Sequence, residues 1–145
     1  MAQATTNRQL QVFKYEKPQE VDGKVSLPMC RSDILSVGVQ VIMKVGGETN
    51  LHSHTGQDEA WLILSGRGKF YDKDKLVAEL GKDEGIFVPK GAPYWFEATE
   101  EPLEILRVAA KDKDIKDERV DYTEPTSRYI ATRGRTGRPP GPGDD

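Results

Sequence analysis

The chain has 145 residues, of which 36% are hydrophobic and 31% are charged, with a formal net charge of -3. This length suits one domain with its own core and leaves no room for a second. The charge balance lacks the positive excess of nucleic-acid-binding proteins, so the expected partners are small molecules or copies of the chain itself.

The N-terminal residues, MAQATTNRQLQVF, lack the apolar run of a signal peptide, and no later segment has the length and apolarity needed to span a bilayer. The single cysteine, Cys30, cannot form an internal disulfide, which agrees with a reducing compartment. We interpret Cys30 as a half-buried structural thiol rather than a nucleophile, because the histidines that could activate it are expected to bind a metal. The protein is therefore expected to be cytoplasmic, without a membrane segment.

From residue 34 onward the sequence predicts short β-strands separated by turn residues. In ILSVGVQVIMKV, residues 34–45, an apolar residue recurs at every second position, which indicates a strand with one face in a core. The further strand-like runs are AWLILS, GKFYD, LVAEL, GIFVP, YWFEA and LEILRVA. No helix is predicted among them. This pattern is typical of an all-β antiparallel sandwich or barrel of about a hundred residues.

The two ends differ from this central region in composition. Residues 1–10 are expected to be a flexible N-terminus, and residues 11–112 to form the domain. The C-terminal part begins with a run of mixed charge and continues into RGRTGRPPGPGDD, which cannot bury enough apolar surface to order itself. Residues 113–145 are therefore predicted to be a charged, largely disordered tail.

Both histidines of the chain lie in GGETNLHSHTGQDEAWLILSG, residues 46–66. His52 and His54 stand at positions i and i+2, so on an extended chain their imidazoles point to the same face. Glu59 follows the turn at Gly56 and can bring a carboxylate back to the same point. Two imidazoles and a carboxylate bind divalent first-row metals well and leave coordination positions open. The pattern therefore predicts a metal site formed by these three side chains.

The same residues carry a resemblance to a known family. The first motif of the cupin superfamily, G-x5-H-x-H-x(3,4)-E-x6-G, is matched at every position by Gly46, His52, His54, Glu59 and Gly66. The chain resembles a small cupin over residues 34–109. This resemblance implies a double-stranded β-helix barrel of jelly-roll type, a metal held in its mouth and, frequently, a homodimer. It does not imply one reaction, because cupins include dioxygenases, isomerases, lyases, epimerases and binding proteins.

The second cupin motif, G-x5-P-x-G-x2-H-x3-N, is matched only in part. Pro89 and Gly91 agree with it. The departures are Asp83 for the first Gly, Tyr94 for the His and Ala98 for the Asn. The His of the motif is the family's fourth metal ligand, so its loss leaves His52, His54 and Glu59 as the expected ligands.

Tyr94 is expected to point inward, because it takes the position of a ligand and shares a strand face with Phe96. A phenol near a divalent cation has a lowered pKa, so Tyr94 is a candidate fourth metal ligand or proton donor. Packing as a barrel-filling aromatic residue is the alternative. The sequence leaves these three roles open.

Further candidate pocket residues lie in the strand-like runs. An apolar lining, which small-ligand sites usually have, is expected from Met43, Trp61, Ile63, Phe87 and Phe96. Core packing explains the same residues equally well. Tyr71 and Arg107 are candidates to orient an anionic or carbonyl substrate. For Arg107, however, an outward side chain with a solvated head is the favoured interpretation.

Three functions are compatible with these residues. An open shell of three ligands favours a dioxygenase or related oxidoreductase that acts on a small organic molecule, with iron as the first choice of metal and manganese, nickel, zinc or copper as alternatives. A second hypothesis is an isomerase or lyase that enolises a metal-bound carbonyl, with Glu59 or Tyr94 moving the proton. The third is a cupin that binds a small molecule without catalysis, its metal anchoring the ligand.

Overall fold

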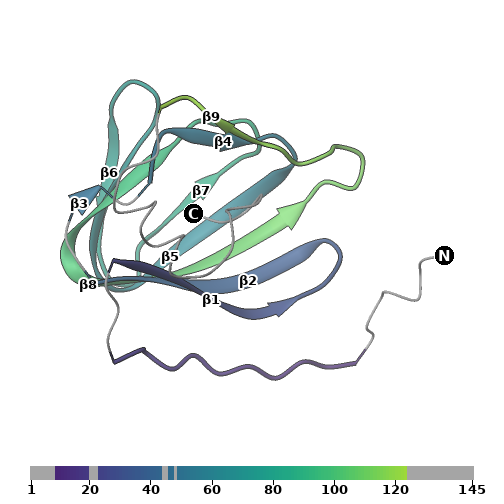
Figure 1. The fold of residues 1–145 in the computed structure, drawn as a ribbon, viewed down its shortest axis with the longest axis horizontal. Helices are drawn as coiled ribbons and strands as arrows, with labels where there is room; N and C mark the ends of the chain where they lie inside the picture. Colours follow the sequence, from purple (N-terminus) through teal and green to yellow (C-terminus); the bar gives the residue numbers. More distant parts are fainter. Residues whose placement is uncertain (1–8, 20–22, 44–45, 48, 124–145) are drawn as a thin grey trace.

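A computed structural model describes residues 9–19, 23–43, 46–47 and 49–123 of the chain. Within these residues every regular element is a β-strand (Figure 1). The strands are β1 (Lys24–Arg31), β2 (Leu35–Ile42), β3 (Gly46–Gly47), β4 (His52–His54), β5 (Gln57–Tyr71), β6 (Leu76–Leu80), β7 (Gly85–Val88), β8 (Trp95–Lys111) and β9 (Arg119–Asp121). The predicted all-β fold is confirmed. No helix capable of crossing a membrane occurs in the described part of the chain.

The strands wrap into a barrel made of two sheets (Figure 1). The larger sheet has the order β1-β2-β8-β5-β6, with β3 added to β8 and β7 added to β5, and the smaller sheet consists of β4 and β9. Figure 1 shows β4 and β9 on one side of the barrel, β1 and β2 on the other, and β5, β7 and β8 between them. All these pairings are antiparallel, as expected for a double-stranded β-helix.

The register of β5 against β8 defines the interior face of the barrel, because residues directly opposite each other share a face. Phe70 lies opposite Phe96 and Ile63 lies opposite Ile105, and all four side chains are buried. The two phenylalanine rings stack with centroids 5.1 Å apart. Further along the same ladder, Trp61 lies opposite Arg107. The interior is therefore apolar at one end of the two strands and becomes polar toward the other.

Strand β2 is more buried than its sequence pattern predicts. Val39 and Val41 are buried on one face as expected, but Gln40 and Ile42 are buried on the other. Glu104 of β8 lies opposite Val41, and its carboxylate accepts a hydrogen bond from the hydroxyl of Tyr15 in the extended segment 9–19. The outward face of β2 is thus covered in part by segment 9–19, most of which the sequence analysis assigned to the domain without predicting what it packs against.

The described barrel extends beyond the predicted boundary at residue 112. Residues 113–123, which were assigned to the disordered tail, include β9, and this strand pairs with the histidine strand β4. The prediction for these residues is wrong because mixed charge was taken as a sign of disorder, whereas the charged side chains of β9 bond to Asn50. The rest of the predicted tail, residues 124–145, and residues 1–8 of the predicted N-terminus lie outside the described residues.

Two turn positions show what the cupin motifs require of the backbone. Gly66 has φ of 81°, and an added Cβ there would lie 2.3 Å from the carbonyl oxygen of Pro102. Asp83, which replaces the first Gly of the second motif, has φ of 71°. Aspartate is one of the few residues other than glycine that adopts this left-handed conformation readily. Asp83 therefore departs from the motif in its side chain but keeps the backbone conformation suited to glycine.

We predict that a chain ending at residue 112 is less stable than a chain ending at residue 123. The shorter chain lacks the β4–β9 ladder and the side-chain bonds from Asn50 to Asp121 and Thr123. Several hydrogen bonds of about 1 kcal/mol each are lost, so the free energy of unfolding in urea should fall by on the order of 3 kcal/mol. Equal stability of the two chains would mean that β9 contributes nothing to the fold.

Candidate functional site

The two histidines lie next to each other in the interior, at β4. His52 is 0% exposed and His54 is 2% exposed, and their ring centroids are 5.2 Å apart. Nδ1 of His52 lies 2.7 Å from the backbone oxygen of Asn50. A carbonyl oxygen only accepts hydrogen bonds, so in the neutral ring Nδ1 carries the hydrogen and Nε2 is the basic nitrogen.

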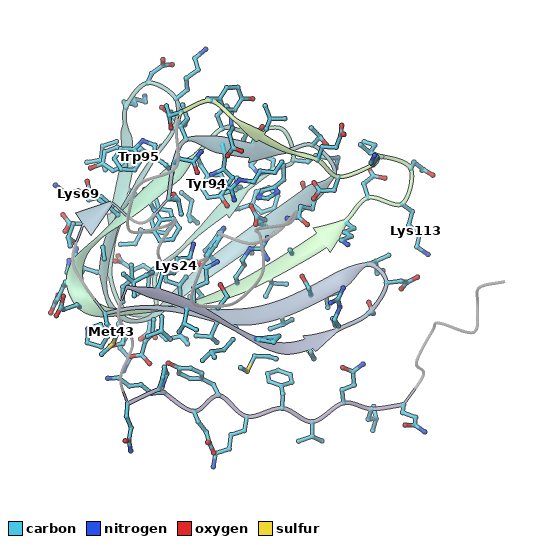
Figure 2. The ribbon with its side chains drawn as sticks, viewed as in Figure 1. Lys24, Met43, Lys69, Tyr94, Trp95 and Lys113 are labelled. Atoms are coloured by element: carbon cyan, nitrogen blue, oxygen red, sulfur yellow. The ribbon has the colours of Figure 1, made fainter. Side chains whose placement is uncertain are left out.

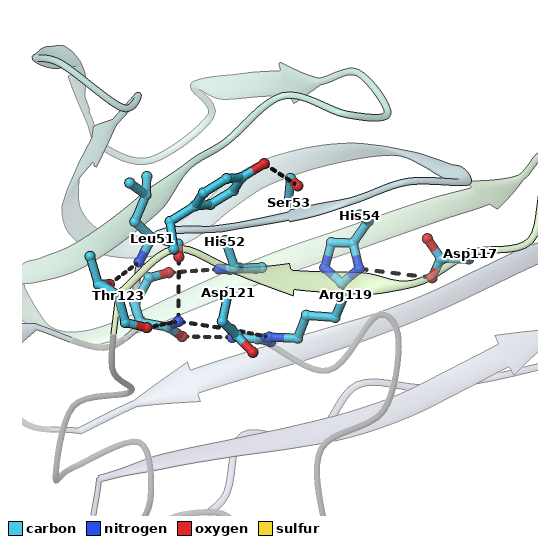
Figure 3. A network of polar contacts seen from close by, with 10 residues as sticks. Leu51, His52, Ser53, His54, Asp117, Arg119, Asp121 and Thr123 are labelled. Carbon is cyan, nitrogen blue, oxygen red and sulfur yellow. Dashed lines mark hydrogen bonds and ion pairs between the residues drawn. The ribbon is translucent and has the colours of Figure 1, made fainter.

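Strand β9 and the loop before it surround the histidine strand with polar groups (Figure 3). Nδ1 of His54 lies 3.8 Å from a carboxylate oxygen of Asp117. Arg119 donates hydrogen bonds to Asp121 at 2.9 Å and to the side chain of Asn50 at 2.7 Å. Burial alone would raise the pKa of Asp121, but hydrogen bonds from Asn50 and Arg119 and the charge of Arg119 outweigh it and hold this pKa below its usual range.

None of these β9 residues was singled out from the sequence. The available signal was the alternation of charged Arg119 and Asp121 with apolar Val120 and Tyr122. An alternation over four residues is a weak signal for a strand, and the many charged residues around it favoured a prediction of disorder instead.

Tyr94 lies in the buried core together with Phe96, as their shared strand face predicts. Its ring centroid is 4.5 Å from that of His52 and 6.3 Å from that of Trp61. The backbones of His52 and Tyr94 exchange two hydrogen bonds, of 3.1 and 2.8 Å, which hold the two side chains together. The Tyr94 ring, labelled in Figure 2, is therefore close to both His52 and Trp61, while its role as metal ligand or proton donor stays a prediction.

Arg107 forms a buried ion pair with Glu59. Nε of Arg107 donates to Oε2 of Glu59 at 2.7 Å, and Nη2 donates to the same oxygen. Glu59 is 1% exposed and Arg107 is 8% exposed. The favoured expectation of an outward, solvated Arg107 is wrong, because Arg107 lies opposite Trp61 on the interior face and its guanidinium carbon is 5.5 Å from the Trp61 ring.

This ion pair alters the predicted metal site. Both histidines have properties of metal ligands, since they are buried neighbours and the ring of His52 is oriented by the backbone oxygen of Asn50. Oε2 of Glu59 accepts two N–H groups from Arg107, so in this arrangement the guanidinium takes up this oxygen of the predicted third ligand. Among the described residues, no three His, Cys, Asp or Glu side chains are grouped so as to hold a metal ion. The two imidazoles thus lie together while Oε2 of Glu59 is bound by Arg107, and the three-ligand set stays a prediction.

The apolar pocket candidates have different locations. Trp61, Ile63 and Phe96 pack in the hydrophobic core, and Met43 is half-buried just beyond the end of β2. Phe87 is 61% exposed, and with Trp61 it lines a second cavity of about 350 Å³, formed by residues of β5, β7 and β8, instead of the barrel interior. It lies opposite the exposed Ala60, whereas its neighbours in β7 face inward, which places its ring on the outside of the barrel.

Tyr71 also lies outside the interior, contrary to its prediction as a substrate-orienting residue. It is opposite Trp95 at the end of the β5–β8 ladder, and the two rings stack with centroids 4.0 Å apart. Its hydroxyl donates to Glu97, and this hydrogen bond raises the pKa of Tyr71. Because Phe70 and Phe96 form the inward pair at this point, the adjacent pair must face outward.

A cavity of about 590 Å³ lies where β1 and β2 approach β5 and β8. Its lining includes the half-buried Cys30 and three cationic residues, Arg31, Arg107 and Lys111. The described residues that line it include no Asp or Glu. Serine hydroxyls from Ser26, Ser32 and Ser36 complete its polar surface. The cavity is therefore a cationic and hydroxyl-rich site, with Arg107 connecting it to Glu59.

Two glutamines in this cavity have polar atoms that suggest a ligand. Oε1 of Gln40 and Nε2 of Gln57 are buried and have no hydrogen-bond partner in the part of the chain that the structure describes. Buried polar atoms are nearly always hydrogen-bonded, so each such atom requires an explanation. One is an acceptor and the other a donor, and a hydroxyl group can satisfy either. Sequence reasoning missed both residues, because a single glutamine in a strand has no distinctive pattern.

We predict that the Glu59–Arg107 pair is strongly coupled. Arg107→Met should lower the free energy of unfolding by about 3–5 kcal/mol, because it leaves a buried carboxylate without its guanidinium. Changing both residues to Met should cost less than this single change, since no buried charge remains. Urea unfolding of the single and double variants measures the coupling. A double variant that loses the sum of the two single losses would show that the residues do not interact.

Comparisons with known proteins agree with this fold. The sequence matches the cupin domain family over residues 39–109. Mannose-1-phosphate guanylyltransferase 2 of Escherichia coli O157:H7 is 36% identical over 76 residues, which make up 50% of this chain and 15% of that protein. The chain thus corresponds to a small part of this relative.

Solved structures with the same architecture include KdgF from Halomonas sp., with a TM-score of 0.63 and 13% identity over 73% of this chain and 97% of that chain. A double-stranded β-helix protein from Klebsiella pneumoniae has a TM-score of 0.63 and 14% identity over 78% and 99% of the two chains. A sugar phosphate isomerase of the cupin superfamily from Silicibacter pomeroyi has a TM-score of 0.60 and 16% identity over 70% and 67%. At these identities the likeness shows the fold alone. Together with the complete first motif, from Gly46 to Gly66, the matches show that the chain belongs to the cupin superfamily.

Proposed function

We propose that this cupin binds an anionic, hydroxyl-bearing small molecule, such as a sugar phosphate or a sugar acid, in the cavity lined by β1, β2 and Arg107. The observation that carries the proposal is the lining of that cavity. It combines three cationic residues with two buried amide groups, and the lining contains no carboxylate among the described residues. Such a surface favours negative charge and supplies hydrogen-bond partners for hydroxyl groups.

The cationic residues have different places in this site. Arg31 and Lys111 are exposed at the rim, where they attract an approaching anion. Arg107 is buried and held by Glu59. A guanidinium has five N–H donors on more than one edge, so it can bind a carboxylate and a ligand anion at the same time. Arg107 is therefore the residue expected to fix the anionic group of the ligand.

The names of two similar proteins guide the choice of test compounds. One is a mannose-1-phosphate guanylyltransferase and another is a sugar phosphate isomerase. Both names refer to phosphorylated sugars, which combine a negative group with several hydroxyls. This coincidence supports sugar phosphates as the first compounds to test.

A reaction of the isomerase or lyase type is a second candidate function. The observation that favours it is the packing of an imidazole against a phenol: the ring centroids of His52 and Tyr94 lie 4.5 Å apart in the buried interior. Such a pair can remove a proton from one carbon and return it to a neighbouring atom. The reaction is tested by exchange of substrate hydrogen for deuterium, which should stop in Tyr94→Phe if the phenol donates the proton.

The dioxygenase reaction expected from the sequence requires Glu59 to join the histidines at a metal. That reaction, and the divalent transition metal with iron as first choice, remain predictions. Elemental analysis of protein purified without a histidine tag tests them together with an oxygen-uptake assay. Binding of an anion in the cavity does not depend on their outcome.

We predict that mannose 1-phosphate binds more tightly than mannose, and that Lys111→Met weakens the binding of the phosphate about 5-fold. A partly exposed ion pair contributes up to about 1 kcal/mol, which corresponds to this factor. Isothermal titration calorimetry at low and moderate salt gives both affinities.

Lys113→Met is the matched control, because Lys113 (labelled in Figure 2) is also an exposed lysine and is not among the residues that line the cavity. It should leave the affinity unchanged. Equal losses in the two lysine variants would indicate a general effect of net charge. Equal affinity for mannose and its phosphate would contradict an anion site.

A further inference from the structure

The Arg107–Glu59 pair occupies the point at which the first cupin motif supplies its carboxylate. Glu59 matches the Glu of that motif, and it is 1% exposed. Both N–H donors that Arg107 directs at Glu59 bond to the same oxygen, Oε2. A divalent ion coordinated by this carboxylate would therefore lie beside a fixed positive charge. The guanidinium and a metal ion compete for one carboxylate.

The position of Arg107 is fixed by the barrel itself. Arg107 lies opposite Trp61 in the β5–β8 ladder, and Glu59 is two residues from Trp61 on the same face. Side chains at such diagonal positions are close enough for long residues to meet. The Trp61 ring 5.5 Å from the guanidinium carbon supports the arginine from one side. Arginine stays protonated at every pH at which the protein is folded, so the competing charge is permanent.

The two imidazoles, in contrast, have the features of ligands. Nδ1 of His52 is oriented by the backbone oxygen of Asn50 at 2.7 Å, and Nδ1 of His54 is 3.8 Å from Asp117. A hydrogen-bonded partner such as the Asn50 oxygen fixes the tautomer and the ring orientation of a metal-binding histidine, whereas the Asp117 carboxylate lies beyond hydrogen-bond distance of His54. The described residues thus contain a buried histidine pair and a carboxylate that an arginine holds, but no grouped set of three donors.

We propose that Arg107 acts as an internal substitute for the metal ion: its guanidinium neutralises Glu59, keeps this carboxylate from completing a three-donor site with His52 and His54, and so limits divalent metal to weak binding by the histidine pair. Removing Arg107 converts the barrel interior into a three-donor metal site. This inference concerns the ligand set alone and does not rest on the proposed anion-binding function.

The test is titration of the full-length apoprotein with Co²⁺, followed by calorimetry and by the visible absorption of the bound ion. Arg107→Met should bind Co²⁺ at least 10-fold more tightly than the wild type, because Glu59 becomes available. The double variant Arg107→Met with Glu59→Gln should return to the wild-type affinity. Lys113→Met, which removes an exposed positive charge outside the cavity, is the control and should show no gain.

A further measurement keeps the proposal testable if Arg107→Met fails to fold. In the presence of Arg107, Glu59→Gln preserves the size of the side chain and should leave the Co²⁺ affinity within 2-fold of the wild type. His52→Ala should abolish the remaining binding. A wild type that binds Co²⁺ as tightly as Arg107→Met, or that loses 10-fold or more in Glu59→Gln, would overturn the proposal, since Glu59 would then be a ligand with Arg107 in place.

Discussion

The buried ion pair between Arg107 and Glu59 is the interaction on which the interior of this cupin depends. Removing two charges from water is costly, and the pair is tolerated because two N–H donors of Arg107 meet one carboxylate oxygen while the Trp61 ring covers the guanidinium. The register of β5 against β8 brings these side chains onto the same face. A shift of this register by one residue would move the Arg107 or the Glu59 side chain to the outer face. The ion pair therefore forms only in this register, and it favours this register over shifted ones.

From this pair the interior divides into two parts with different chemistry. One part is a mainly apolar core in which Phe70, Phe96 and Ile63 pack together, with the buried Lys24 ammonium 5.6 Å from the Phe96 ring centroid. The other contains the histidine strand on one side and the cationic cavity on the other, with Arg107 lining that cavity. The apolar part supplies most of the stability through burial, which allows the polar part to keep groups that are suited to binding rather than to packing.

The sequence was informative wherever a pattern is local. The period-two runs located most strands, and the spacing of His52 and His54 placed two imidazoles together, as the structure has them. The sequence does not reveal the register between strands that are distant in the chain. This register turns the side chain of Arg107 inward and that of Phe87 outward, although the sequence around each residue predicts only that it lies in a strand. Composition misled for residues 113–123, whose charges bond to a buried asparagine instead of to water. Gln40 and Gln57 could not be identified as site residues from the sequence. They stand out only in the structure, where Oε1 of Gln40 and Nε2 of Gln57 are buried without a hydrogen-bond partner among the described residues.

The most direct test of this account is the side-chain NMR signal of Arg107. If its guanidinium is held by Glu59 in the interior, its Nε–Hε resonance should exchange slowly with water, appear downfield of the resonances of exposed arginines, and move upfield in Glu59→Gln. It should also persist after one equivalent of Zn²⁺ is added. An Arg107 signal that exchanges as fast as those of exposed arginines, or that is displaced by stoichiometric Zn²⁺, would contradict an interior organised by this ion pair.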